Sequence, residues 1–253
     1  MRALYKYSTP SCPKCFIHTS GTGILITDDV ATGAYGTQND KVFDDWEGIK
    51  EITSLPDHAL HRKVDKIVLD ASESAPDYIK TAIVCPPAIY GLGRGPGNRK
   101  RSQIYFLART LLKAGKGTRI GEGRNIWSAV HVQDLSRLFL LLGEAGTSMD
   151  APATWRAEGY YFAENGEFLW GDVLKEMARI AFEKKLITSP ELVEIPSTGS
   201  EETPAFFLHM WGTNSRSRAV RARRLLDWRP QMPDLWDVLP EIVEGEAKVL
   251  SML

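Results

Sequence analysis

The sequence predicts an α/β fold built on a parallel sheet. Short apolar runs, typical of strands covered on both faces, alternate along the chain with longer stretches in which apolar residues recur at helical spacing. Such alternation is typical of βαβ units, in which a helix connects two parallel strands. The 253 residues include 43% hydrophobic and 25% charged residues, ordinary values for a globular protein with a sizeable core.

The first strand is expected at residues 15–20, CFIHTS, after an irregular N-terminal segment over 1–14 that contains two prolines. A polar, glycine-rich stretch follows. Ser54, Pro56 and Asp57 then form a pattern typical of a helix start, with a cap residue, an early proline and an acidic side chain. The apolar residues of this helix are spaced to form one face: Leu60, Val64, Ile67, Val68 and Ala71.

The pattern continues with a strand at 81–87, TAIVCPP, and a loop that contains four glycines. A helix over 104–115 and a strand at 128–132 follow, and Asp134 is expected to cap the next helix. The remaining expectations are a mixed stretch of loop and short strand at 186–210 and helices near 169–184, 215–226 and 234–250.

Composition excludes several classes of protein. A formal net charge of −1 gives no general reason to bind nucleic acid or an anionic membrane. The longest apolar runs, such as LFLLL at 138–142, are too short to span a bilayer, and no secretion signal is visible. Three cysteines without a disulfide pattern suit a reducing compartment. The predicted location is therefore the cytoplasm, with no membrane partner.

Cys12 and Cys15 form a single CxxC motif, which is compatible with half of a zinc site or with a redox pair. A zinc site needs two further ligands, and His18 is the nearest candidate. A redox pair should begin a helix, whereas an apolar strand follows this motif. We therefore interpret the two residues as ordinary thiols and expect no metal.

Five arginines cluster near the C-terminus and suggest either a phosphorylated ligand or nucleic acid. Acidic residues over 234–246 lie just downstream, so pairing within the chain is favoured and no nucleic acid is expected. The arginines are Arg216, Arg218, Arg221, Arg223 and Arg224.

Five segments in register resemble the extended short-chain dehydrogenase/reductase superfamily, in its NAD-dependent epimerase/dehydratase branch and most closely its atypical fungal members. They are FIHTSGTGIL (16–25), HRKVDKIVLDA (61–71), AIVCPPAIYGLG (82–93), WSAVHVQDLSRLFLLL (127–142) and NSRSRAVRARRLLDWRP (214–230). The resemblance implies an incomplete doubly wound, Rossmann-like parallel sheet. It places a truncated NAD(P)-binding region at 15–150 and a smaller, mainly substrate-domain portion at 151–253.

The same resemblance implies an oxidoreductase or an epimerase/dehydratase that transfers a hydride with NAD or NADP. Its substrate would be a small-molecule carbonyl or alcohol, or a nucleotide sugar. The alternative is a non-catalytic homologue, either a sensor or binding protein or a truncated inactive product. Turnover would identify an enzyme, and cofactor binding without turnover would identify a sensor.

Family members begin with a strand, a glycine-rich turn and a helix that together hold the cofactor pyrophosphate. No such turn precedes Phe16, whose strand resembles about the fifth of the family. The first half of the nucleotide-binding sheet is therefore expected to be missing. This expectation predicts weak NAD(P) binding and an exposed sheet edge that favours self-association.

The family's catalytic helix carries Tyr-x-x-x-Lys, and the resemblance places His61 at the tyrosine and Asp65 at the lysine. A histidine titrates near neutral pH and suits proton transfer, and an aspartate one turn away could orient it or raise its pKa. The alternative is a pair on the helix surface with no catalytic part. The family's hydroxyl residue falls at or beside Gly21, which makes Thr22 a candidate catalytic residue and Ser20 its neighbour.

The resemblance also supplies candidate binding residues. Ser20, Gly21, Pro86, Pro87 and Ile89 are expected to lie along the cofactor. The candidate substrate residues are Tyr90, Arg94 and His131. Packing is the alternative for all of them, since prolines stiffen loops, hydroxyls cap strand ends and a buried histidine is commonly hydrogen-bonded in a structural role.

Overall fold

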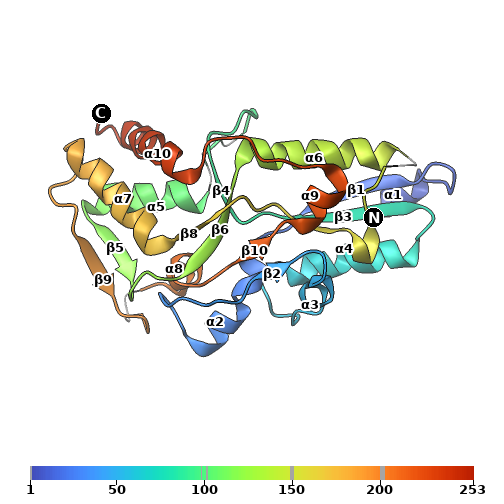
Figure 1. Cartoon of the computed structure of the whole chain (residues 1–253), viewed down its shortest axis with the longest axis horizontal. Coiled ribbons are helices and arrows are strands. Elements are labelled where there is room, and N and C mark those ends of the chain that lie inside the picture. Colours follow the sequence, from blue (N-terminus) through green and yellow to red (C-terminus); the bar gives the residue numbers. More distant parts are fainter. Residues whose placement is uncertain (1, 98, 101, 149–150, 200–202) are drawn as a thin grey trace.

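The central sheet of the protein is parallel, as predicted. The computed structural model describes residues 2–97, 99–100, 102–148, 151–199 and 203–253 (Figure 1). Strands β1 (Lys14–Thr19), β3 (Ile79–Cys85) and β7 (Tyr160–Phe162) lie side by side in that order, all parallel. The α/β fold expected from the sequence is thus confirmed, and β1 forms one edge of this sheet among the described residues.

Helices cover both faces of this sheet. Figure 1 shows α6 (Val132–Thr147) on one side of β1 and β3, and α4 (Arg62–Ser74) on the other. The core side chains of β3 are at most 1% exposed from Ala82 to Cys85, which explains why its sequence is an unbroken apolar run.

A second group of strands packs with its own helices around a separate core. Strand β6 (Ile126–His131) pairs in parallel with β4 (Ala88–Tyr90) and antiparallel with β8 (Glu167–Leu169). Two further parallel pairs are β5 (Gly117–Ile120) with β9 (Leu192–Ile195), and β2 (Phe43–Asp44) with β10 (Ser217–Arg218). The helices of this core are α5 (Gln103–Ala114), α7 (Trp170–Glu183) and α10 (Leu235–Val249).

The short elements were harder to predict than the long ones. Helices of five to seven residues contain too few turns to show an apolar period. They are α1 (Arg2–Lys6), α2 (Thr27–Thr32), α3 (Ile49–Thr53) and α8 (Ala205–Trp211), with short 3-10 turns at η1 (Thr22–Ile26) and η2 (Arg156–Glu158). The helix expected near 215–226 is present as α9 (Val220–Leu226) and begins later than expected.

The helix expected to begin near Ser54 in fact begins at Arg62. Ser54 ends α3 instead, where its backbone N–H donates to the carbonyls of Lys50 and Glu51. His61 has a left-handed backbone with φ of 68°, and this conformation separates α4 from the turns before it. The start pattern at 54–57 is therefore a turn between two helices.

The apolar stripe expected to face the core is also wrong in part. Leu60, Val64 and Ile67 are 55%, 49% and 62% exposed, whereas Arg62 and Asp65 are buried. These polar residues can be buried because they are hydrogen-bonded. The Arg62 guanidinium donates to the carbonyls of Leu55 and Thr53, and the Asp65 carboxylate accepts hydrogen bonds from two hydroxyl groups. Periodicity alone does not reveal such partners.

Asp134 does not cap its helix. The His131 side chain caps α6 by accepting a hydrogen bond from the Gln133 backbone N–H. The Asp134 carboxylate accepts instead from the backbone N–H groups of Gln231 and Met232, nearly a hundred residues later in the chain. It thereby fixes the segment before α10 against α6.

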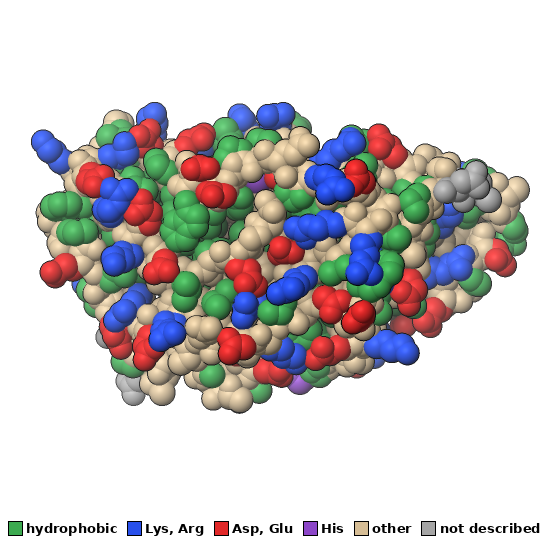
Figure 2. Space-filling model, viewed as in Figure 1, with side chains coloured by type: hydrophobic (Ala, Val, Ile, Leu, Met, Phe, Trp, Pro, Cys, Tyr) green, Lys and Arg blue, Asp and Glu red, His purple; other side chains and the backbone are tan. Residues whose placement is uncertain are grey.

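The arginine cluster pairs within the chain. Arg216 lies 2.8 Å from Glu167, Arg221 lies 3.0 Å from Glu158, and Arg223 lies 3.1 Å from Glu164. The partners come from the segment before α7 rather than from the acidic stretch at 234–246. On the face of the molecule drawn in Figure 2, acidic and basic side chains are interspersed without an extended patch of either sign.

The two cysteines of the CxxC motif have different surroundings, since Cys12 is exposed and Cys15 is half-buried. Cys15 lies in β1, where burial raises the pKa of its thiol to about 11, although nearby Lys80 opposes this effect. Across the described residues no group of three or more metal-ligating side chains converges, and no helix there is long and apolar enough to cross a membrane.

We expect the purified protein to contain less than stoichiometric zinc, because a metal site needs deprotonated thiols and further ligands. Elemental analysis of the wild-type protein and of Cys12→Ala checks this. One zinc per chain that disappears in Cys12→Ala would contradict the prediction.

Candidate functional site at the carboxyl end of the parallel strands

A large cavity opens where β1 and β3 end. The loop Ser20–Gly21–Thr22 follows β1, and Pro86 and Pro87 follow β3. The Thr22 N–H donates to the Pro86 carbonyl at 3.0 Å and holds the two loops together. The cavity measures about 760 Å³ and lies in the position where open α/β sheets bind ligands.

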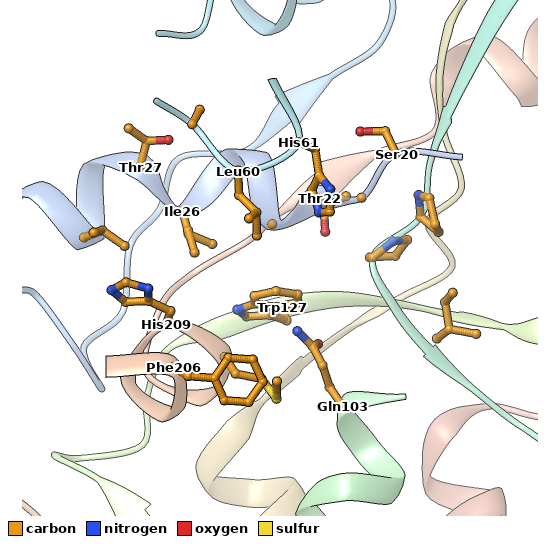
Figure 3. Close-up of a pocket in the computed structure, with 18 of the residues that line it drawn as sticks. Ser20, Thr22, Ile26, Thr27, Leu60, His61, Gln103, Trp127, Phe206 and His209 are labelled. Atoms are coloured by element: carbon orange, nitrogen blue, oxygen red, sulfur yellow. The ribbon is translucent and has the colours of Figure 1, made fainter. Parts of the chain in front are cut away.

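The cavity wall combines these loops with residues from distant parts of the chain. Figure 3 shows Ile26 and Thr27 on one wall, Trp127 of β6 across the middle, and Gln103 of α5 opposite Thr22. Phe206 and His209 of α8 close the remaining side. All candidate cofactor residues predicted from the sequence line this cavity: Ser20, Gly21, Pro86, Pro87 and Ile89.

His61 enters the cavity from the N-terminus of α4. Its left-handed backbone directs the imidazole against the turn after β1, so that a Cβ on Gly21 would stand only 3.0 Å from His61 Nε2. Glycine at position 21 therefore permits this close approach. Partial desolvation lowers the pKa of His61 below its usual 6.5, against the attraction of Asp65. The residue as a whole is nevertheless exposed.

Asp65 lies behind the cavity rather than in it. Its carboxylate is 0% exposed and accepts hydrogen bonds from Ser20 Oγ at 2.8 Å and Tyr160 Oη at 3.1 Å. His18 Nε2 lies 3.5 Å from its other oxygen. Burial raises the pKa of Asp65, while the two hydroxyls and then the two histidines oppose the rise. Asp65 thus orients the turn that carries Thr22.

Thr22 supplies a hydroxyl that has no partner within the described chain. The residue is 1% exposed, and its Oγ1 makes no hydrogen bond there. A buried hydroxyl without a partner costs about 1–3 kcal/mol, so a ligand oxygen that completes this bond would bind favourably.

The candidate substrate residues lie outside the cavity lining. Tyr90 is 1% exposed and donates its hydroxyl to the Pro233 carbonyl at 3.1 Å. The His131 ring contacts Tyr90 edge to face at 5.4 Å while it caps α6. Arg94 is exposed in the loop after β4. The structure therefore brings together Thr22, His61 and the cofactor candidates, and leaves these three residues apart.

Several residues of the site had no visible signal in the sequence. His18 of β1 was not among the candidates for this site, although its place two residues before the candidate Ser20 in an extended segment could have indicated that both side chains point the same way. Tyr160, Gln103 and Phe206 reach the site only through tertiary packing.

Comparison with known proteins identifies relatives of the chain. The chain is 35% identical to the oxidase ucsJ of an Acremonium species over 243 residues. This match covers 93% of the chain and 70% of the oxidase. The chain belongs to the family of this fungal oxidase. No family model matches the sequence.

Solved structures of NAD-dependent epimerases and dehydratases share the family's fold. One is the UDP-glucose 4-epimerase of Thermotoga maritima, at 19% identity and a TM-score of 0.60, over 98% of this chain and 67% of the other. Another is the dTDP-glucose 4,6-dehydratase of Bacillus anthracis in complex with NAD, at 16% and 0.60, over 98% and 64%. A third is DesIV of Streptomyces venezuelae with NAD and TYD bound, at 16% and 0.58, over 93% and 60%. The chain thus spans about two thirds of the length of these neighbours, and its fold is Rossmann-like.

The residues of this family member fit one end of a nicotinamide dinucleotide. Pro86, Pro87 and Ile89 offer an apolar wall for a flat ring, and the unpaired Thr22 hydroxyl offers a polar contact beside it. The pyrophosphate end finds no cationic counterpart, because the described residues that line the cavity include neither lysine nor arginine.

Proposed function

We propose that the protein is a nicotinamide-dependent oxidoreductase that interconverts an alcohol and a carbonyl group in this cavity. One observation carries the proposal: a titratable imidazole and an unpaired hydroxyl, His61 and Thr22, converge at the carboxyl ends of two parallel strands. Sequence similarity to a fungal oxidase also supports redox chemistry.

When bound, NAD or NADP supplies or accepts the hydride. The Thr22 hydroxyl would hold the substrate oxygen, and His61 Nε2 would take the hydroxyl proton during oxidation or return it during reduction. An alcohol thereby loses one proton to His61 and one hydride from carbon, which leaves a carbonyl. Asp65 would hold the Ser20 turn in place and attract the imidazolium.

The proposal is tested by incubating the purified chain with reduced cofactor and a panel of aldehydes and ketones. We expect slow consumption of reduced nicotinamide that requires millimolar cofactor. Absence of turnover with the whole panel, at saturating cofactor, would overturn the proposal.

The second candidate is a binding protein without hydride transfer. Asp65 occupies the position that the resemblance gives to lysine, and no lysine of α4 is among the described residues that line the cavity. Calorimetry that detects cofactor binding in a protein without turnover would favour this candidate. Absence of both would favour an inactive product.

We expect no resolvable shift in melting temperature with NAD or NADP at about 1 mM, because the described lining residues include no lysine or arginine to pair with the phosphates. A ligand at about 100 times its Kd stabilises the native state by roughly 2.7 kcal/mol. That gain corresponds to a rise of about 5–10 °C for a domain of this size. Differential scanning fluorimetry measures it, and a clear rise would show that the pyrophosphate is held by other means.

We also expect the chain to self-associate. Strand β1 forms a sheet edge among the described residues, and Val64 and Ile67 add exposed apolar side chains on α4. Light scattering after size exclusion checks this, and a stable monomer at micromolar concentration would contradict it.

A further inference from the structure

Three buried polar atoms without partners surround the same cavity. They are Thr22 Oγ1, Ser102 Oγ and Gln103 Oε1, none of which makes a hydrogen bond within the described chain. Figure 3 shows the Thr22 hydroxyl and the Gln103 amide extended toward the cavity from opposite walls, on either side of Trp127. Since buried polar groups are nearly always satisfied, this arrangement indicates a ligand with a polar group near each wall.

The rest of the cavity is apolar. Its lining includes Ile26, Val30, Leu60, Trp127, Phe206 and Met210. Phe206 is 57% exposed and belongs to a cluster of rings in which Phe207 stacks on Trp211 at 5.0 Å. Large exposed aromatic side chains beside a cavity are typical of surfaces that bind apolar ligands.

Charge also restricts the ligand. Of the described residues in the lining, none is Lys, Arg, Asp or Glu, and its ionisable side chains are His58, His61 and His209. Proteins bind diphosphates through arginine, lysine or rows of N–H groups at helix N-termini. The lining includes the N-terminus of α5 at Ser102 and Gln103 but no arginine or lysine among its described residues, so the diphosphate of a nucleotide sugar would be desolvated there without a cationic partner, at a large cost.

We propose that the substrate is an uncharged carbonyl or alcohol compound with a large apolar body and a second polar group. This inference rests on the proposed function and selects among its substrates. Thr22 and His61 hold the reacting oxygen, the amide of Gln103 binds the second polar group, and Phe206 and Met210 pack against the apolar body. Gln103 and Phe206 thereby determine specificity.

The test uses binding without cofactor, so that it does not depend on hydride transfer. Nile red, an uncharged dye that fluoresces in apolar sites, reports occupancy of the cavity. Its competitors are 2-decanone, a series of hydroxydecan-2-ones that differ in the position of the hydroxyl, and UDP-glucose. We expect the ketones to displace the dye at concentrations at least about tenfold lower than UDP-glucose, and at least one hydroxyketone to exceed 2-decanone.

Variants test whether the dye and the ketones bind in this cavity. Phe206→Asp should weaken dye and ketone binding at least about tenfold, because it places a charge in the apolar wall. Phe182→Asp, at an exposed phenylalanine of α7 outside the lining, is the matched control and should bind as the wild type does. Gln103→Leu should abolish the advantage of the hydroxyketone while 2-decanone still binds.

Displacement by UDP-glucose at ketone concentrations, or equal dye binding in Phe206→Asp, would overturn the inference. No gain from any hydroxyl, or a gain that survives Gln103→Leu, would remove the role of Gln103. Binding as expected in a protein without turnover would contradict the proposed function alone. Turnover of UDP-glucose without turnover of ketones would contradict this inference alone.

Discussion

Replacing His61 by alanine should lower kcat for carbonyl reduction at least about tenfold, since positioned acid/base groups contribute 10²–10⁴. The imidazole lies against the Gly21 turn, next to the unpaired Thr22 hydroxyl. Initial rates of cofactor oxidation measure the effect. Added imidazole should restore part of the lost rate in His61→Ala, because it can occupy the emptied space.

The backbone at position 61 requires a second variant. An alanine with φ of 68° is strained, whereas asparagine adopts this conformation readily and cannot transfer a proton at neutral pH. His61→Asn should therefore lose rate while it keeps stability, and Lys63→Ala, an exposed neighbour on α4, should keep both. Unchanged turnover in His61→Asn would refute the assignment of His61 as proton donor.

The reaction should depend on pH through the same residue. Reduction needs the imidazolium, and the pKa of His61 is lowered by desolvation, so the rate should fall as pH rises through a pKa below 6.5. Oxidation needs the neutral imidazole and should rise over the same interval. Rate profiles in both directions measure this, and they should become flat in His61→Asn.

Replacing Asp45 by alanine should lower the free energy of unfolding by about 3–5 kcal/mol. The carboxylate is 0% exposed and accepts hydrogen bonds from the backbone N–H groups of Phe162, Val220 and Arg221, each at 2.8 Å. It thereby joins the end of β7 to the start of α9. Burial raises the pKa of Asp45 to about 6, so the charge itself is costly, but removal of the carboxylate leaves three backbone N–H donors without their acceptor, while the Arg221 guanidinium keeps its bond to the Asp45 backbone carbonyl.

Urea unfolding of the variant measures the loss. Asp45→Asn keeps one acceptor oxygen and should lose less than Asp45→Ala, and the exposed Glu47→Ala should stay within about 0.5 kcal/mol of the wild type. A variant Asp45→Ala as stable as Glu47→Ala would show that water or another acceptor replaces the carboxylate.

The long elements could be predicted because their signals are local. The runs at β1 and β3 and the periods of α7 and α10 follow from burial on both faces of a sheet or on one face of a helix. The loops after β1 and β3 could be proposed as a site from the family resemblance, and the structure brings Ser20, Thr22, Pro86 and Pro87 into one cavity.

The same reasoning failed where polar groups are buried. Nothing local shows that Arg62 reaches the carbonyl of Leu55, or that Tyr160, 95 residues later, bonds to Asp65. With these polar residues buried, only part of the expected apolar face of α4 packs inward: Val68 is buried, whereas Val64 and Ile67 are exposed. Hydrophobic periodicity reflects only the free energy of moving apolar side chains out of water. The stability gained from a buried hydrogen bond depends instead on which residues contact each other in the folded protein.

The sequence by itself determined the α/β class and the parallel sheet, because these depend on local period and on chain order, and its family resemblance indicated the loops after two strands as a candidate site. Tertiary structure alone decided the content of the site. In the fold, His61 has a left-handed backbone, and Tyr90 and His131 lie outside the cavity lining. Gln103 and Phe206, from helices distant in the sequence, line the cavity instead. Cavity shape and hydrogen-bond partners depend on contacts across the fold, and these contacts have no periodic signature in the chain.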